Sequence, residues 1–276
     1  MELGYLGPAG TFSEEAANSY LAGRGTARPY PSIPLLLKAA ENKEISQALV
    51  PLENSLEGSV SPTLSALVTT PLLITAEVIL PITHFLAMRP GTKKPKRVLS
   101  HPHALAQCSD YLDSLDVEIS ATASTAAAAR LVAESDEELA AICTRRAAEL
   151  YGLIPTEIPT GEANLTRFIV LAQEDAAPTG QDKTSLLLSA KADRSGWLYE
   201  VLREFAEKDI NLTRIESRPT GKALGHYYFF IDFEGHRTES RVKAALENIE
   251  KTVSLFRLLG SYPKAKDPWQ EMKPRV

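Results

Sequence analysis

The segment Asn164-Leu165-Thr166-Arg167-Phe168 places a hydroxyl group beside a guanidinium group at the entry to a strand-like apolar run. A threonine hydroxyl can donate or accept a hydrogen bond, and an arginine can hold a carboxylate through two parallel N–H groups. The pair therefore indicates contact with a small carboxylate-bearing molecule. An ordinary ion pair at the surface is the alternative that these residues leave open.

A second polar segment, Pro51–Ser59, directly follows a predicted strand and contains Glu53, Asn54 and Glu57. It offers an amide, hydroxyl groups and carboxylates, which is more polar chemistry than a turn requires. Loops on a rigid scaffold carry function more often than the scaffold does, so we expect this segment to contact a ligand.

The third segment runs from Ser100 to Cys108 and opens a predicted helix. Ser100 or His101 can cap this helix, and Pro102 is suited to its first turn. His103 and Gln107 are four residues apart and share one helix face. Two histidines this close suggest zinc, but no further cluster of Cys and His completes a tetrahedral set, so we expect no metal.

Two more segments place glycine or hydroxyl residues immediately before predicted helices. Gly10 and Thr11 precede one helix, and Ser124 and Thr125 open an alanine-rich one. The free N–H groups of a helix start can bind an anion, and the same hydroxyls are also ordinary helix caps. Both interpretations stay open on the motifs alone.

The chain contains no zinc-protease motif, no Cys-x-x-Cys, no Ser-His-Asp order and no nucleophile elbow. Covalent and metal catalysis are therefore disfavoured. The remaining chemistry is that of hydroxyls, amides and arginine arranged around a small anion.

Up to about residue 171 the chain alternates strand-like and helix-like stretches, which favours a parallel, helix-covered α/β sheet. Ligands bind such sheets in the loops that follow the strands. The expected strands are 2–6, 47–51, 72–88 (interrupted at Pro81), 97–99, 117–120, 139–143 and 166–172, and the expected helices are 12–21, 102–115, 124–133 and 145–151.

Residues 174–183 are polar, contain a proline and a glycine, and indicate a linker. Beyond the linker the pattern is β-α-β-β-α-β, the ferredoxin-like arrangement. Its expected elements are strands 184–190, 210–216, 227–233 and 253–259 and helices 197–207 and 239–248.

The bulk properties restrict the class of protein further. A net charge of -5 over 276 residues argues against a broad nucleic-acid surface, and no apolar run reaches the length of a membrane span. The first residues lack the features of a signal peptide, so we expect a cytoplasmic protein. Cys108 and Cys143 lie in apolar contexts, where buried free thiols are expected.

Taken in order, the five segments resemble the bacterial prephenate dehydratase family, and Glu216-Ser217-Arg218-Pro219 resembles the effector motif of an ACT regulatory domain. The resemblance implies conversion of prephenate to phenylpyruvate without a cofactor, and inhibition by L-phenylalanine at ACT–ACT contacts of a homodimer or homotetramer. It also implies a catalytic domain over 1–178 with two lobes like a periplasmic binding protein. These would be 1–75 with 165–178, and 76–164; the ACT domain would be 184–262, and 263–276 a tail.

The resemblance also assigns roles to residues. Its catalytic residues would be Thr166, with Asn54, Ser100 and Gln107 positioning the substrate. The substrate-binding candidates are Arg167, Phe168, Gly10, Thr11, Ser124 and Thr125. The effector-binding candidates are Gly196, Leu198, Asn211, Leu212, Glu216, Ser217, Arg218 and Pro219.

Two positions depart from the family pattern. Some relatives carry a carboxylate where this chain has Ala123, so that residue supplies no proton, and Glu57 is the substitute we consider. Trp197 stands in the effector motif where relatives usually have a small residue. An arogenate dehydratase and a non-catalytic amino-acid sensor or binding protein are the alternative functions.

Overall fold

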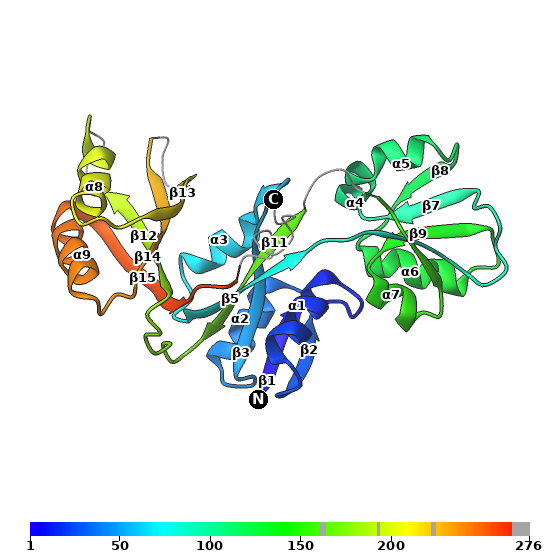
Figure 1. The fold of residues 1–276 in the computed structure, drawn as a ribbon, viewed down its shortest axis with the longest axis horizontal. Coiled ribbons are helices and arrows are strands. Elements are labelled where there is room, and N and C mark those ends of the chain that lie inside the picture. Colours follow the sequence, from blue (N-terminus) through cyan, green and yellow to red (C-terminus); the bar gives the residue numbers. More distant parts are fainter. Residues whose placement is uncertain (160–163, 192–193, 222–224, 267–276) are drawn as a thin grey trace, which may run out of the picture. The chain divides into compact units, whose positions relative to one another are not determined.

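The computed structural model describes residues 1–159, 164–191, 194–221 and 225–266 (Figure 1). The chain divides into two compact units, one built from Met1–Leu64 and Val78–Phe168 and the other from Ser65–Glu77 and Ile169–Lys266. Most of the predicted tail, 267–276, lies outside the described residues. No helix in the described part of the chain is long and apolar enough to cross a membrane.

The first sheet has the strand order β2-β1-β3-β11-β5, with the short β4 added to β3. β1 pairs in parallel with both β2 and β3, and helices α1 and α2 pack against β1. Ser32 caps α2 by accepting a hydrogen bond from the backbone N–H of Leu35. The elements are β1 (Glu2–Leu6), α1 (Phe12–Leu21), β2 (Thr26–Tyr30), α2 (Ile33–Glu41), β3 (Gln47–Asn54), β4 (Gly58–Ser59), α3 (Ser61–Leu67), β5 (Leu73–Pro81) and β11 (Leu165–Ala172).

The second sheet has the order β10-β6-β9-β7-β8 and is covered by helices on both faces. The central strand β9 contacts helices on both faces. Ala141 packs with α6 and α7, and the neighbouring Ala140 and Ile142 pack with α4 and α5. Successive side chains of a strand point to opposite faces, so β9 is buried along its whole length. The elements are β6 (Phe85–Met88), β7 (Arg97–Ser100), α4 (Pro102–Gln107), α5 (Ser109–Asp113), β8 (Glu118–Ala121), α6 (Thr125–Glu134), β9 (Leu139–Cys143), α7 (Arg145–Leu150) and β10 (Ile154–Glu157).

The third sheet lies in the second unit and is antiparallel, with the order β13-β14-β12-β15. Its elements follow the predicted β-α-β-β-α-β order. One face carries α8 and α9 over an apolar core that includes Phe205 and Phe233. The elements are β12 (Asp182–Ala190), α8 (Trp197–Ala206), β13 (Leu212–Pro219), β14 (Tyr227–Glu234), α9 (Ser240–Thr252) and β15 (Val253–Pro263).

Three expectations need correction. The sheets of the first unit are mixed rather than parallel, because β4, β6 and β10 run antiparallel to their neighbours. The single helix predicted over 102–115 is two helices, α4 and α5, separated at Cys108. β12 begins at Asp182, inside the predicted linker.

Both cysteines are free and buried, as the sequence predicts. Burial raises the pKa of Cys108 to about 11 and that of Cys143 to about 12. Because the thiolate is the reactive form, we expect neither cysteine of the folded protein to react with an aromatic disulfide reagent near neutral pH. Two thiols per chain should react once the protein is unfolded in urea. Rapid labelling of the folded protein would contradict this burial.

Candidate active site

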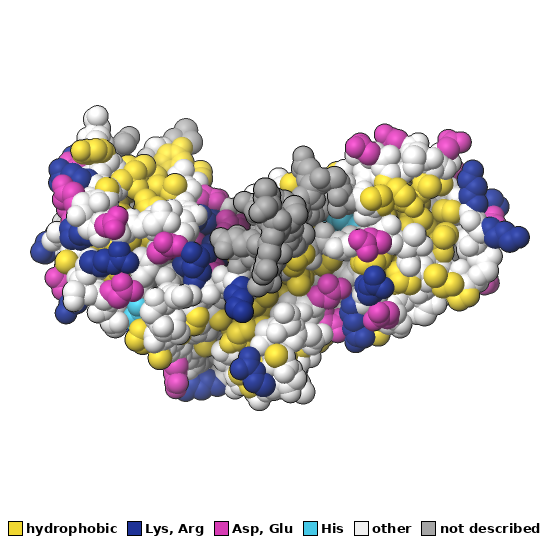
Figure 2. All heavy atoms as spheres, in the orientation of Figure 1, with side chains coloured by type: hydrophobic (Ala, Val, Ile, Leu, Met, Phe, Trp, Pro, Cys, Tyr) yellow, Lys and Arg dark blue, Asp and Glu magenta, His cyan; other side chains and the backbone are white. Residues whose placement is uncertain are grey.

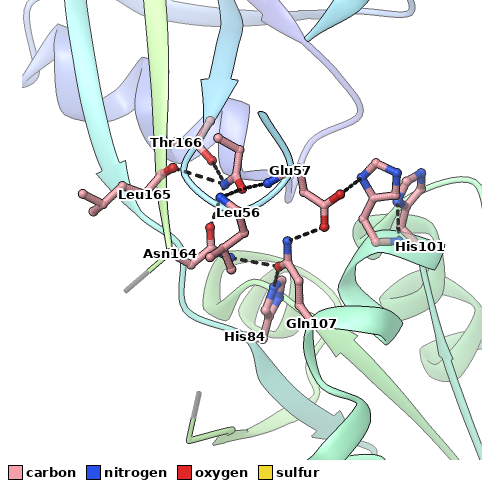
Figure 3. A network of polar contacts seen from close by, with 10 residues as sticks. Leu56, Glu57, His84, His101, Gln107, Asn164, Leu165 and Thr166 are labelled. Carbon is pink, nitrogen blue, oxygen red and sulfur yellow. Dashed lines mark hydrogen bonds and ion pairs between the residues drawn. The ribbon is translucent and has the colours of Figure 1, made fainter. Parts of the chain in front are cut away.

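Three of the predicted catalytic residues lie together in the first unit (Figure 3). Asn54 ends strand β3, Thr166 is the second residue of β11, and Gln107 ends helix α4. Asn164, just before β11, joins them into one hydrogen-bonded group. The segments that the sequence singles out separately therefore meet through side-chain amides.

The orientations of the side-chain amides in this group can be assigned, starting from Asn54. Its Oδ1 accepts hydrogen bonds from the backbone N–H groups of Leu56 and Glu57, at 2.9 and 3.0 Å. A backbone N–H can only donate, so the amide of Asn54 has one orientation and its Nδ2 is the donor. That Nδ2 lies 2.6 Å from Asn164 Oδ1, 2.9 Å from Thr166 Oγ1 and 3.2 Å from the backbone oxygen of Leu165, so its two hydrogens are shared among three acceptors.

The orientation of Asn54 in turn determines those of Asn164 and Gln107. Asn164 Oδ1 is an acceptor, so Asn164 Nδ2 donates to Gln107 Oε1 at 2.9 Å. Gln107 Nε2 then donates to Glu57 Oε1 at 3.2 Å. Asn54, Asn164 and Gln107 thus point the same way, from two backbone N–H groups to the Glu57 carboxylate. Aligned hydrogen bonds of this kind polarise and strengthen one another.

Because Asn54 Nδ2 is a donor, the Thr166 hydroxyl oxygen accepts its hydrogen bond. Within the described part of the chain the hydroxyl hydrogen meets no acceptor. The side chain is largely buried, with 9% of its surface exposed. The hydroxyl hydrogen is therefore available to a bound molecule. This is the chemistry that a hydrogen-bond donor to a departing oxygen requires.

Arg167, the next residue on β11, forms an ion pair with Glu53 of β3. Its Nη1 lies 3.0 Å from Glu53 Oε1; the Arg167 side chain is 7% exposed and that of Glu53 is 32% exposed. The alternative of an ion pair is thus found, with its basic partner buried. The next side chain, Phe168, is 2% exposed and lies in the core, and its contact with substrate stays a prediction.

Ser100 is the predicted catalytic residue that the structure does not bring into this group. Its side chain is fully buried, and its hydroxyl donates to the backbone oxygen of Ile142 at 2.6 Å. The bond ties β7 to the adjacent β9 at the end from which α4 starts. This bond gives Ser100 a structural role, and its predicted contact with substrate stays a prediction.

The loop before α1 also differs from expectation. Thr11 occupies the cap position of α1 but makes no capping bond, because its hydroxyl donates to Pro8 O within the loop at 3.0 Å. The backbone N–H of Gly10 donates to the carboxylate of Glu14, which therefore occupies the place an anion would take. Gly10 has φ +86° and its backbone oxygen accepts from Thr144 Oγ1, so a side chain there would be strained. Anion binding by Gly10 and Thr11 remains a prediction.

The start of α6 matches the capping alternative. Ser124 Oγ accepts from the backbone N–H of Ala127 at 3.0 Å, and Thr125 is the first helical residue. Substrate binding by Ser124 and Thr125 remains a prediction. Among the described residues no three His, Cys, Asp or Glu side chains form a group able to hold a metal.

Two predicted effector residues flank Trp197 at the start of α8. Gly196 has φ +80° with open space where a side chain would be, and Leu198 packs against the core of the second unit. Trp197 itself belongs to that core, with its ring 5.1 Å from the ring of Phe229. Its buried indole N–H finds no acceptor within the residues that the structure covers.

The predicted effector residues near β13 alternate between its two faces. Glu216 and Arg218 are half-buried, and their neighbours Ser217 and Pro219 are exposed. Glu216 Oε2 lies 2.7 Å from Arg214 Nη2, and Arg218 Nη1 donates to Ser65 Oγ of α3 at 3.1 Å. The remaining two candidates are Asn211, exposed just before the strand, and Leu212, which packs against the core of this unit.

Two residues of this hydrogen-bonded group were not predicted from the sequence. Asn164 stands in a motif that the sequence singles out, but only its neighbours are given roles there. His84, on the short stretch between β5 and β6, lies 2.8 Å from Gln107 Oε1 through its Nε2. The available signal was a histidine inside an apolar, strand-like run.

Comparison with known proteins identifies the families that resemble each part. A family described as prephenate dehydratase matches residues 3–176, and one described as the ACT domain matches residues 184–251. The bifunctional chorismate mutase/prephenate dehydratase of Neisseria gonorrhoeae is 40% identical over 272 residues, which cover 96% of this chain and 75% of that protein. The structure of prephenate dehydratase from Arthrobacter aurescens in complex with L-Phe has a TM-score of 0.88 and 37% identity, and covers 100% of this chain and 92% of its own.

A solved structure with a different described activity is also similar. It is described as GqqA, a novel type of quorum quenching acylase, with a TM-score of 0.89 and 27% identity, covering 98% of this chain and all of its own. One architecture therefore carries more than one described activity. The activity of this chain has to be argued from its site.

Proposed function

This chain belongs to the prephenate dehydratase family, and we propose that it converts prephenate to phenylpyruvate under feedback control by L-phenylalanine. The observation that carries the proposal is the Thr166 hydroxyl, held as an acceptor by Asn54 so that its hydrogen is left for the substrate. The ordered amides around it supply fixed dipoles rather than a nucleophile or a metal.

The reaction suits such a site. Loss of carbon dioxide from the ring of prephenate leaves an electron pair that moves through the diene and expels the ring hydroxyl. One proton taken up by that hydroxyl gives water, so the products are phenylpyruvate, carbon dioxide and water. The aromatic ring that forms drives the reaction. The site therefore has to orient the dianion and assist departure of the hydroxyl group.

Thr166 would donate a hydrogen bond from its hydroxyl group to the departing oxygen. Asn54 would donate to the Thr166 oxygen, so the Thr166 hydrogen would point away from Asn54 and be free for this donation. Primary amides do not pass protons along, so Glu57 at the far end of the chain would anchor Gln107 rather than supply Thr166 with a proton. The proton taken up would then come from solvent, which takes Glu57 out of the role considered for it. Arg167 is paired with Glu53, and its contact with a substrate carboxylate stays a prediction.

Regulation would arise in the second unit. The face of that unit in Figure 2 shows hydrophobic side chains at the surface, and Ile215 on β13 and Tyr227 on β14 are exposed. β13 is an edge strand, and an exposed apolar edge favours association with another chain. We therefore keep the expectation of a homodimer or homotetramer, with L-phenylalanine bound where two such edges meet. Acidic and basic side chains are interspersed over that face, so association of two copies would not bring two surfaces of like charge together.

Substrate preference tests the proposal against its nearest alternative. The purified protein is given prephenate and arogenate separately, and kcat/KM is measured for phenylpyruvate and phenylalanine formation. We expect kcat/KM to be higher for prephenate. A reversed preference would make it an arogenate dehydratase, and binding of either compound without turnover would favour the sensor.

Ser217 tests where the effector binds. Its side chain is exposed on β13, so Ser217→Ala removes a hydroxyl that could bind the effector without disturbing the core. Loss of one such hydrogen bond, about 1 kcal/mol, should raise the half-inhibiting phenylalanine concentration about fivefold. Each rate is compared with the uninhibited rate of the same variant.

Thr213→Ala is the matched control, since Thr213 is another exposed hydroxyl on the same strand. We expect its inhibition curve to overlay that of the unmodified protein. An unchanged curve for Ser217→Ala would remove Ser217 from the effector site. Equal shifts in both variants would indicate a general effect on the strand.

A further inference from the structure

The amide chain has a branch at Gln107 that the proposed reaction does not use. Gln107 Oε1 lies 2.8 Å from His84 Nε2 as well as 2.9 Å from Asn164 Nδ2 (Figure 3). His84 is 2% exposed, and its ring packs edge-to-face on Phe12 with centroids 5.6 Å apart. A buried histidine that contacts a site residue either takes part in the reaction or positions the residues that do.

The protonation of His84 follows from the same reasoning that orients the amides. Gln107 Oε1 is an acceptor, because Asn164 Nδ2 donates to it and Gln107 Nε2 faces the Glu57 carboxylate. An atom 2.8 Å from an acceptor has to carry a hydrogen, so His84 Nε2 is protonated. Two backbone N–H groups at Leu56 and Glu57 thus determine a histidine tautomer four hydrogen bonds away.

The other ring nitrogen is not protonated. His84 Nδ1 is buried and meets no hydrogen-bond partner in the described parts of the chain. A hydrogen on Nδ1 would be an unsatisfied donor on a charged ring. Burial also lowers the pKa of His84, with the hydrogen bond to Gln107 acting in the opposite direction.

We propose that His84 is a positioning residue: as the neutral Nε2–H tautomer it holds the Gln107 amide in the direction set from Asn54, and so keeps in order the amide chain that contacts Thr166. With a hydrogen on Nδ1 instead, a lone pair on Nε2 would face the Gln107 oxygen. Gln107 would then turn its amide, and its NH₂ group would meet the NH₂ group of Asn164. His84 touches neither Thr166 nor the atoms that react, so it acts only through Gln107.

The tautomer can be measured without any activity. Long-range ¹H–¹⁵N spectra of the ¹⁵N-histidine-labelled protein distinguish a protonated ring nitrogen from one with a lone pair, and the signal missing in His84→Gln assigns His84. We expect a protonated Nε2 and an unprotonated Nδ1 near neutral pH, because the ring is buried and Nε2 faces the Gln107 oxygen. An Nδ1–H tautomer, or a charged ring at neutral pH, would overturn the inference.

Three variants separate positioning from packing. His84→Gln keeps a donor near the Nε2 position, His84→Asn places it near Nδ1, and His84→Leu removes it. We expect kcat to fall about 10- to 100-fold in His84→Leu and His84→Asn, with little change in KM, and to be largely restored in His84→Gln. Equal losses in all three folded variants, or no loss in any, would overturn the positioning role.

The kinetic part rests on the proposed function, whereas the spectra do not. If the unmodified protein fails to turn over prephenate, the proposed function is wrong and kcat of the His84 variants cannot be compared. The ¹⁵N spectra would still confirm or overturn the tautomer, and with it the direction of the Gln107 amide. The two failures are therefore distinguishable.

Discussion

Replacing Thr166 by valine is expected to lower kcat for prephenate by about 10²–10⁴-fold, the range typical of removing a group that assists proton transfer. Valine has the shape of threonine but no hydroxyl, so no group remains to donate to the departing oxygen. The same change leaves Asn54 Nδ2 without the acceptor that it has at 2.9 Å. Most of the effect should be in kcat rather than KM, because the lost hydrogen bond strengthens as the bond to oxygen breaks.

Thr166→Ser is the matched control, since it keeps the hydroxyl and removes only a methyl group. We expect it to retain activity within about tenfold of the unmodified enzyme, the most that a missing buried methyl group should cost. Steady-state kinetics of the three proteins, with far-UV circular dichroism to verify folding, make the comparison. A folded Thr166→Val enzyme with near-normal kcat would remove Thr166 from the reaction.

Replacing Lys183 by methionine is expected to destabilise the second unit by about 3–5 kcal/mol, the cost of leaving a buried charge without its partner. Lys183 Nζ lies 2.9 Å from Glu77 Oε1, and the Glu77 side chain is fully buried while that of Lys183 is 10% exposed. The pair joins β12 to β5, and Glu77 also accepts from the backbone N–H of Ala265. Methionine is similar in length to lysine, so the change removes the charge more than the packing.

The double variant Glu77→Gln with Lys183→Met tests whether charge is the cause. Glutamine keeps an oxygen for the Ala265 N–H but carries no charge, so we expect it to recover most of the lost stability. Urea unfolding followed by fluorescence and circular dichroism gives the free energies of unfolding. If the double variant were as unstable as Lys183→Met alone, lost packing rather than an unpaired charge would explain the effect.

The architecture was largely predictable because most elements carry their signal locally. The β-α-β-β-α-β order of the second unit follows from alternating apolar positions, and the structure has that order. β2 was missed since Thr26–Tyr30 contains Pro29 and few buried side chains. Such a strand lies at the edge of its sheet, where a proline is tolerated and apolar periodicity is weak.

The site was predictable in its members but not in its connections. Asn54, Gln107 and Thr166 lie together as expected, although 112 residues of sequence separate the first from the last. The direction of each amide depends on contacts made only after folding, starting from two backbone N–H groups. No local pattern contains that information, which is why the role of Asn164 could not be predicted.

Burial and strand pairing give some predicted site residues partners within the chain. Ser100 is 0% exposed and Phe168 2% exposed, and Ser100 donates to the backbone oxygen of Ile142, a partner 42 residues away that its local sequence does not reveal. Arg167 next to Thr166 invites a substrate carboxylate, whereas the folded chain brings Glu53 of β3 to it. Long-range strand pairing supplies that partner, and local spacing does not reveal it.

The most direct test of the account is phenylpyruvate formation from prephenate by the purified protein, with and without L-phenylalanine. We predict turnover that L-phenylalanine suppresses, which requires both the Thr166 site and the ACT domain to act as described. Turnover that phenylalanine leaves unchanged would contradict the proposed regulation and direct attention to Trp197 in the effector motif. Absence of phenylpyruvate from a folded protein at saturating prephenate would contradict the proposed function itself.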